Sequence, residues 1–341
     1  MKRAASSRPH VHPPRVIEVT RGEGVESLHR VRAAVSDGDS ILEMFGDAEA
    51  PTFYRSCSKP MQAWPLVESG AADRFGLSSA ELAIACGSHS GTPAHTGAVQ
   101  EMLRRGGLDV RDLQCGVHPP RDEQALAALA ESGESPSALH HNCSGKHAGM
   151  LLRCQHEGWP VDSYLDPFHP HQLQIRAVIA GYAAMKPEEV LVAIDGCSAP
   201  VFGVPTTSMA RSFARLAQGR GPDGRPSDAT SRIVQAMRTH PDMVGGPGRF
   251  DTEFMWASEG DYLVKIGAEG VYGVGHIPTG RGLAFKIEDG NGRAVPVALL
   301  DLLDALRWPI PEGAEPFVTE VVTNFRGLET GLIRPLRGLL H

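Results

Sequence analysis

The sequence contains few lysines for a chain of its length. Only 6 of its 33 basic residues are lysines, which leaves 27 arginines. Arginine therefore supplies most of the positive charge. Lysine differs from arginine because its amine can lose a proton when it is buried and can then act as a base or a metal ligand. The lysines that remain are Lys2, Lys59, Lys146, Lys186, Lys265 and Lys286.

The sequence also lacks several signals that would place it in other classes of protein. Residues 1–15 contain no continuous apolar run, so they predict neither a signal peptide nor a membrane span but a disordered tip on a cytoplasmic protein. No C-x-x-C pattern occurs, and in a reducing compartment we expect the six cysteines to be buried thiols, metal ligands or reactive groups rather than disulfides. A net charge of -7 argues against nucleic-acid or anionic membrane partners.

The order of sequence patterns predicts an α+β fold, an α/β sandwich. Residues 16–48 and 261–287 contain apolar, β-branched runs separated by turn residues, whereas about 96–235 show mainly helical periodicity. We therefore expect one antiparallel sheet built from both termini, flanked by helices, with a closing helix at 295–308. Residues 16–341 form a single domain in this prediction. Its sheet subdomain spans about 16–55 and 255–341, and its helical subdomain spans about 56–254.

Ser56 and Lys59 form an S-x-x-K pattern directly after the N-terminal strands. If a helix begins here, residues three apart lie on one face and their side chains meet. A neutral lysine then takes the serine proton and produces an activated nucleophile. The alternative is a surface serine beside a solvated lysine, because so short a pattern also arises by chance. Lys265 lies on a late predicted strand followed by glycines, where serine β-lactamases carry their K-T-G element, and this favours the catalytic interpretation.

Cys143, Lys146 and Cys197 are candidates for a metal site. Cys143 and Lys146 lie three residues apart on a predicted helical turn, and Cys197 follows a predicted strand at 191–195. Two thiolates and a neutral nitrogen, with water in the fourth position, make a tetrahedral Zn²⁺ site. His147 is an alternative nitrogen ligand. The other interpretation is that both cysteines are ordinary buried thiols.

Two glycine-rich segments complete the set of candidates. In the first, at 86–95, Ser88 either contacts the substrate, acts as a second nucleophile or caps a tight turn. The second, at 240–255, lacks the G-x-x-x-x-G-K-[ST] pattern, which argues against a nucleotide site. We expect it to line the mouth of the site with three possible substrate contacts, Arg249, Asp251 and Glu253.

Together these segments resemble the bacterial asparaginase II proteins of the Rhizobium etli type, whose fold is similar to that of the serine β-lactamases. The resemblance runs through VESLHRV at 25–31, RSCSKP, CGSHSG, NCSGKHAGM, DGCSAP, HPDMVGG and KIGAEGVYGVG. It implies hydrolysis of L-asparagine to L-aspartate and ammonia. It also implies a homodimer, which is the most frequent oligomer in general.

The resemblance assigns further roles to particular residues. It implies two Ser-Lys pairs that face one pocket, Ser56 with Lys59 and Ser88 with Lys265, and it leaves open which serine is the nucleophile. It implies a Zn²⁺ ion that tunes substrate binding rather than performing the hydrolysis, held by Cys143, Lys146, Cys197 and a water. Arg55 is then a partner for the substrate carboxylate, Asp195 a contact to its α-amino group or to the metal shell, and His147 a neighbour of the ligands.

Three other functions remain open from the sequence. A glutaminase needs only one methylene more of room than an asparaginase. A β-lactamase-like amidase, esterase or peptidase would use the same Ser-Lys pair, although KIGAEG departs from K-T-G. In a zinc-stabilised binding protein the serines would be inert, and removal of the metal would unfold the chain.

Overall fold

A computed structural model of the protein describes residues 8–314 and 317–336. The largest sheet in this part of the chain has nine strands, seven of which follow the order β11-β12-β2-β3-β10-β9-β8, while β4 pairs with β3 and with β1. The strands are β1 (His10–His12), β2 (Arg15–Arg21), β3 (Gly24–Ser36), β4 (Ile41–Phe45), β8 (Tyr262–Gly267), β9 (Val271–His276), β10 (Arg281–Ile287), β11 (Glu320–Thr323) and β12 (Glu329–Pro335).

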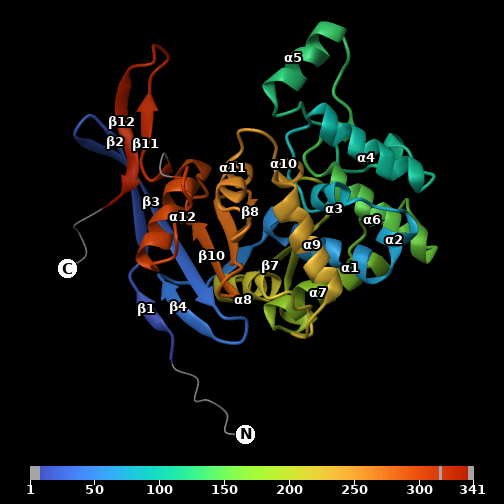
Figure 1. Ribbon diagram of the computed structural model, residues 1–341, viewed down its shortest axis with the longest axis horizontal. Helices are drawn as coiled ribbons and strands as arrows, with labels where there is room; N and C mark the ends of the chain where they lie inside the picture. Colours follow the sequence, from blue (N-terminus) through green and yellow to red (C-terminus); the bar gives the residue numbers. More distant parts are fainter. Residues whose placement is uncertain (1–7, 315–316, 337–341) are drawn as a thin grey trace, which may run out of the picture.

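The two ends of the chain meet at the centre of this sheet. β3 and β10 are antiparallel, with Val35 opposite Leu283 and Ala33 opposite Phe285. All four side chains are buried, and so are Ala34 and Ala284 between them, so the centre of the sheet is covered on both faces. Figure 1 shows the early strands beside the late ones. The predicted α+β fold, with an antiparallel sheet assembled from both termini, is confirmed.

The residues between the two halves of the sheet form most of the helices, which gather on one side of the molecule (Figure 1). The α-helices are α1 (Lys59–Glu68), α2 (Ala71–Arg74), α3 (Ser79–Ala85), α4 (Pro93–Arg105), α5 (Glu123–Ser132), α6 (Ser144–Glu157), α7 (Pro170–Ala183), α8 (Thr206–Ala217), α9 (Asp228–Thr239), α10 (Pro241–Val244), α11 (Phe250–Ala257) and α12 (Val295–Ala305). Short 3-10 helices are η1 (Arg55–Ser58), η2 (Val110–Asp112), η3 (Ala138–His140), η4 (Pro187–Glu189) and η5 (Gly292–Ala294).

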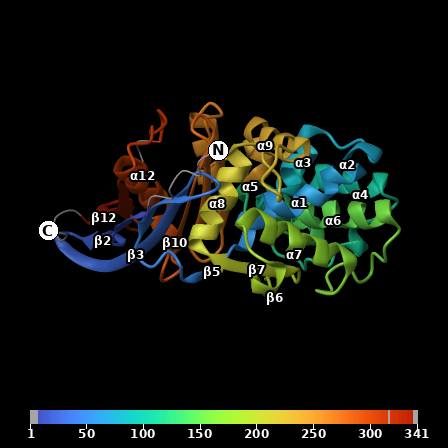
Figure 2. The same cartoon turned by 90° about the horizontal axis from the view of Figure 1, so that it is seen from below.

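Helix α8 joins the sheet to the helical part of the molecule and lies between them in Figure 2. Two strand glycines permit its close approach. A Cβ atom at Gly282 would lie 2.2 Å from the carbonyl oxygen of Ala210, and one at Gly273 would lie 2.0 Å from the Phe213 ring. A side chain at either position would force the helix away from the sheet.

The C-terminal part of the fold differs from the sequence-based prediction. The helix expected at 295–308 is present as α12, but the chain does not close there. It returns to the sheet as β11 and β12, and β12 pairs with β2 so that Ile333 lies opposite Val19. Much of this hairpin is exposed, so its strands lack the clear alternation of apolar and polar residues that would have predicted them.

Two other parts were also not anticipated. Residues 1–7 of the expected disordered tip lie outside the described residues, but His10–His12 form β1 and pair in parallel with β4. A separate sheet has the order β5-β7-β6, with β5 (Pro51–Phe53), β6 (Leu191–Ile194) and β7 (Pro200–Pro205). Within the described ranges, none of the helices has the length and apolar character needed to cross a membrane.

Candidate active site

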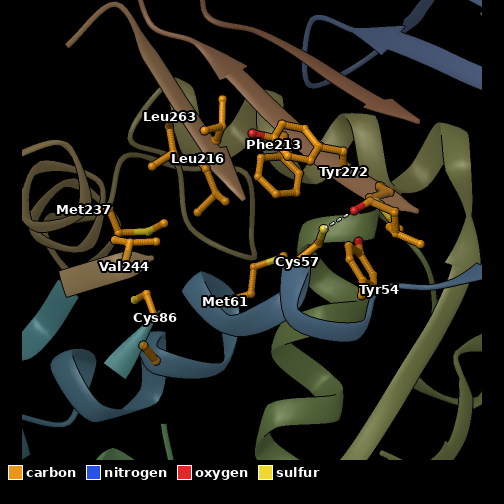
Figure 3. Close-up of a cluster of buried hydrophobic side chains, with 14 of the residues drawn as sticks. Tyr54, Cys57, Met61, Cys86, Phe213, Leu216, Met237, Val244, Leu263 and Tyr272 are labelled. Carbon is orange, nitrogen blue, oxygen red and sulfur yellow. Dashed lines mark hydrogen bonds between the residues drawn. The ribbon is translucent and has the colours of Figure 1, made fainter. Parts of the chain in front are cut away.

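The site begins at the turn between β5 and α1. Here η1 is tied to β8, because the Cys57 thiol donates to the carbonyl oxygen of Lys265 at 3.0 Å. Arg55 has φ of +50°, a left-handed conformation that costs energy for a residue other than glycine. Figure 3 shows Tyr54, Cys57 and Met61 in the buried cluster that supports this turn. The turn therefore occupies a fixed position against the sheet.

Lys59 is the first residue of α1, and its amine reaches a loop that follows α3. Lys59 is buried with 2% of its surface exposed. Its Nζ donates to Ser88 Oγ at 3.1 Å, to the Asn142 carbonyl oxygen at 3.4 Å and to the Gly87 carbonyl oxygen. Gly87 is required here, since a Cβ atom would lie 2.7 Å from the Met243 carbonyl oxygen. The structure thus brings together a buried lysine and a buried serine 29 positions apart in the sequence.

This contact differs from the pairing that the family resemblance implies. Ser56 lies in η1 rather than on α1 and is partly exposed. Lys59 instead hydrogen-bonds to Ser88. Lys265 bonds to the Ile266 carbonyl oxygen at 2.9 Å, and its Nζ lies 3.7 Å from Asp251 Oδ2. The structure therefore brings Ser88 to Lys59, and it gives Lys265 a carboxylate neighbour.

Burial changes the chemistry of Lys265. Its side chain is fully buried, and desolvation lowers the pKa of its amine to about 8, although the Asp251 carboxylate opposes this shift. The nearby positive charge of Lys59 lowers the pKa further. A substantial fraction of Lys265 is therefore neutral near pH 8, as a base requires.

The three predicted metal ligands converge at the start of α6. Lys146 Nζ donates to Cys197 Sγ at 3.0 Å. A hydrogen bond from Cys197 lowers the pKa of Cys143 well below that of an ordinary thiol despite burial, and the charges of Lys59 and Lys146 act in the same direction. Burial alone lowers the pKa of Lys146, but the two sulfurs more than reverse this effect and raise it.

These residues fit a zinc ion. Two thiolates and an amine form a soft donor set, and a water completes four-coordination. Among the described residues, no group of three His, Cys, Asp or Glu side chains is arranged to hold a metal, so an ion bound here would need Lys146 as its third protein ligand. Because its amine bears a proton without an ion, the binding of a metal here would release that proton.

Histidines surround this donor set. His147 is fully buried, and burial lowers the pKa of its imidazole to about 4. Its Nδ1 pairs with the Tyr164 hydroxyl at 2.7 Å, whereas its Nε2 has no hydrogen-bond partner. His147 is thus neutral and adjoins the ligands, as expected. His89 Nε2 lies 2.9 Å from Ser144 Oγ, a contact that the sequence did not indicate.

Arg55 and Asp195 connect the serine region to the thiol region. Arg55 Nε donates to Asp195 Oδ1 at 2.7 Å, and the Gly196 N–H donates to the same oxygen at 2.8 Å. Burial alone raises the pKa of Asp195, but the charge of Arg55 and these hydrogen bonds lower it overall. The two residues predicted to contact substrate therefore pair with each other and lie beside both candidate centres.

The segment at 240–255, which we expected to line the mouth of the site, also reaches its interior. Asp251 is only 3% exposed, lies near the start of α11 and contacts Lys265. Glu253 Oε1 accepts from the Gly248 N–H at 2.9 Å and supports the turn before the helix. Asp251 therefore belongs to the interior of the site.

The sequence matches the model of a known protein family over most of its length. The model of the L-asparaginase II family matches residues 17–335. The chain belongs to the L-asparaginase II family. Its family is one of amidohydrolases. No curated protein matches this L-asparaginase II family member in sequence.

Solved structures similar to this L-asparaginase II family member include Mglu in its glutamate form, with 14% sequence identity and a TM-score of 0.44. That match covers 82% of this chain, which spans 61% of the Mglu chain. Another is the probable glutaminase from Bacillus subtilis complexed with 6-diazo-5-oxo-L-norleucine, with 15% identity and a TM-score of 0.38, covering 83% of this chain and 85% of that one.

Proposed function

We propose that the protein hydrolyses L-asparagine to L-aspartate and ammonia through a serine activated by lysine. The observation that carries this proposal is the buried contact of 3.1 Å between Lys59 Nζ and Ser88 Oγ. Ser88 is 4% exposed, so the pair is shielded from bulk water, which strengthens electrostatic interactions. The membership of the family supports an amide as substrate.

The acceptors around Lys59 determine where a neutral amine directs its lone pair. The carbonyl oxygens of Gly87 and Asn142 can only accept, whereas the Ser88 hydroxyl can accept or donate. An ammonium group donates to all three. When Lys59 is neutral, its two remaining hydrogens satisfy the carbonyls, and its lone pair faces the Ser88 hydroxyl. Lys59 is therefore suited to take the proton of Ser88.

The reaction follows from this geometry. Ser88 Oγ attacks the side-chain carboxamide carbon, and its proton passes to Lys59 Nζ. The C–N bond breaks, the lysine returns the proton to the leaving nitrogen, and ammonia departs to leave an acyl ester on Ser88. A water then loses a proton to the amine and attacks the ester, which releases L-aspartate and restores the serine.

The second lysine and the other serine have supporting roles in this proposal. Lys265, with its lowered pKa, acts as a further base in the same buried region. Ser56, in η1, contacts the substrate. Arg55 binds the substrate carboxylate, and Asp195 holds Arg55 and contacts the α-amino group.

A zinc ion bound by Cys143, Lys146 and Cys197 completes the proposal. When bound, Zn²⁺ supplies a positive charge and fixed geometry beside the site, and it modulates substrate binding without entering the hydrolysis. His147 and Tyr164 pack next to these ligands and restrict their movement.

Ammonia release from L-asparagine and L-glutamine, measured side by side, tests the proposal. We expect turnover of asparagine in the wild-type protein and a decrease of roughly 10³-fold or more for Ser88→Ala. Ser56→Ala should lose less. Ser90→Ala is the matched control, because this hydroxyl in the same loop donates to the Gly245 carbonyl oxygen. Undiminished turnover by Ser88→Ala would assign the nucleophile elsewhere, and preferential turnover of glutamine would replace the proposed substrate.

We also propose a cytoplasmic homodimer. All six cysteines are free and buried, which supports a reducing compartment. Apolar side chains on β6 are exposed, with Leu191 at 49% and Ile194 at 76%, and this edge of the small sheet is suited to contact a second copy. Light scattering after gel filtration should give twice the mass of the 36.5 kDa chain. A mass of one chain at micromolar concentration would contradict the dimer.

A further inference from the structure

The environment of Lys265 contains one carboxylate that the catalytic proposal does not use. Asp251 and Lys265 are both almost completely buried, and Asp251 Oδ2 lies 3.7 Å from Lys265 Nζ. The same oxygen accepts from the Ile266 N–H at 2.8 Å, and Lys265 donates to the Ile266 carbonyl oxygen at 2.9 Å. The peptide groups of Ile266 therefore hold the carboxylate and the amine side by side.

This arrangement is costly as a purely structural feature. A buried ion pair contributes little to stability compared with apolar side chains of similar volume, because both charges lose their hydration. The buried Tyr272 hydroxyl also faces the Asp251 carboxylate, and burial together with this carboxylate raises the pKa of the tyrosine. The carboxylate is thus enclosed by groups that hold it in place next to the amine.

The other charged and titratable groups around Lys265 show why Asp251 matters. Lys59 on α1 and Arg249 before α11 are cations that disfavour a charge on Lys265. Burial raises the pKa of the Cys57 thiol on η1 and of Tyr272 on β9, so both are neutral near pH 7. Asp251 is the one carboxylate among these groups, and it opposes the two cations.

We propose that Asp251 is a positioning residue for Lys265, which fixes the amine beside Ile266 and determines the pH at which the amine releases its proton. Without the carboxylate, burial and the two cations would keep Lys265 neutral over a wider pH range. With it, the amine both accepts and returns a proton near neutral pH. This inference rests on the proposed role of Lys265 as a base, but the behaviour of the amine can be measured independently of activity.

The scarcity of lysine makes a direct experiment practical. In protein labelled with ¹³C only at lysine Cε, the six lysines give at most six signals, and Lys265→Met identifies the signal of Lys265. We expect this signal to titrate near pH 8 in the wild-type protein. In Asp251→Asn the midpoint should fall by about 1 to 3 pH units, because a neighbouring opposite charge has been removed. Asparagine retains an oxygen for the Ile266 N–H.

Asp261→Asn is the matched control, since Asp261 is exposed just before β8 and should leave the titration of Lys265 unchanged. Asp251→Ser removes the same charge with a smaller side chain and replaces Asp251→Asn if that variant does not fold. An unchanged midpoint in the folded neutral variant would overturn the inference.

Measurements of activity distinguish a failure of this inference from a failure of the proposed function. If the acidic limb of the kcat/KM profile moves to lower pH together with the NMR midpoint, both are supported. If the NMR midpoint moves but Lys265→Met retains full activity, Asp251 controls Lys265, and the role of Lys265 as a base is wrong.

Discussion

Lys265 and Lys146 are both buried, yet their surroundings shift the pKa values of their amines in opposite directions. Burial lowers the pKa of Lys265 to about 8, with one carboxylate opposing the shift. Burial also acts to lower the pKa of Lys146, but the sulfurs of Cys197 and Cys143 reverse the effect and raise it. Burial alone therefore does not decide the pKa of a lysine; the balance between neighbouring anions and cations does.

This difference separates two uses of one residue type. Lys265 can release its proton near neutral pH without assistance, as a base requires, whereas Lys146 in the proposed zinc site would give up its proton only to a metal ion that competes for the amine. Arginine can do neither, since its guanidinium stays charged. The sequence therefore retains lysine at these positions while arginine supplies charge elsewhere.

Replacement of Lys59 should have the largest effect on the serine region. Lys59→Arg keeps the positive charge but removes the group that can accept the Ser88 proton, so we expect kcat for asparagine to fall about 10³-fold. Steady-state ammonia release measures this loss. Lys186→Arg, at an exposed position, is the control and should retain wild-type activity. If Lys59→Arg keeps most of its activity, lysine is not needed there as a base.

The pH dependence of activity should be the next largest effect. If the neutral form of Lys265 is the active one, kcat/KM should rise tenfold per pH unit below about pH 8 and level off above it, because deprotonation increases with pH. Between pH 6 and pH 9 the rise should be roughly 100-fold. In Lys265→Met the residual activity should lose this limb. A flat wild-type profile across this range would contradict the role of Lys265.

Removal of the metal tests the role of the proposed zinc site. After treatment with a chelator we expect KM for asparagine to increase about tenfold with little change in kcat, since the ion is proposed to tune binding. Circular dichroism should show a folded protein, and added Zn²⁺ should restore KM. Unfolding on chelation would indicate a structural ion, and a selective loss of kcat would indicate an ion that takes part in the hydrolysis.

The sequence predicted those parts of the candidate site that depend on residues close together in the chain. The family blocks located both lysines, and the three-residue spacing of Cys143 and Lys146 indicated their convergence at the start of α6. The sequence did not indicate that Ser56 lies in a 3-10 turn before α1. It also did not indicate that the amine of Lys59 hydrogen-bonds to Ser88.

The remaining contacts depend on tertiary packing. Lys59 is held by the carbonyl oxygens of Gly87 and Asn142, and backbone acceptors leave no signature in a side-chain pattern. Asp251 lies in a glycine-rich segment that we expected to line the mouth of the site, and the packing of α11 against β8 makes it a buried neighbour of Lys265. Sequence spacing predicts neighbours within one helical turn, but not which distant loops converge.

The smallest expected effect concerns the ion pair that joins the two regions. Asp195→Asn removes the charge that holds Arg55, and because this pair is partly exposed, its contribution is expected to be about 0.7 kcal/mol. KM for asparagine should therefore rise about threefold while kcat stays within a factor of two. Asp223→Asn, on an exposed loop, is the matched control. A large decrease in kcat would mean that Arg55 and Asp195 position the reacting groups, whereas an unchanged KM would mean that the serine and thiol regions bind substrate independently of this contact.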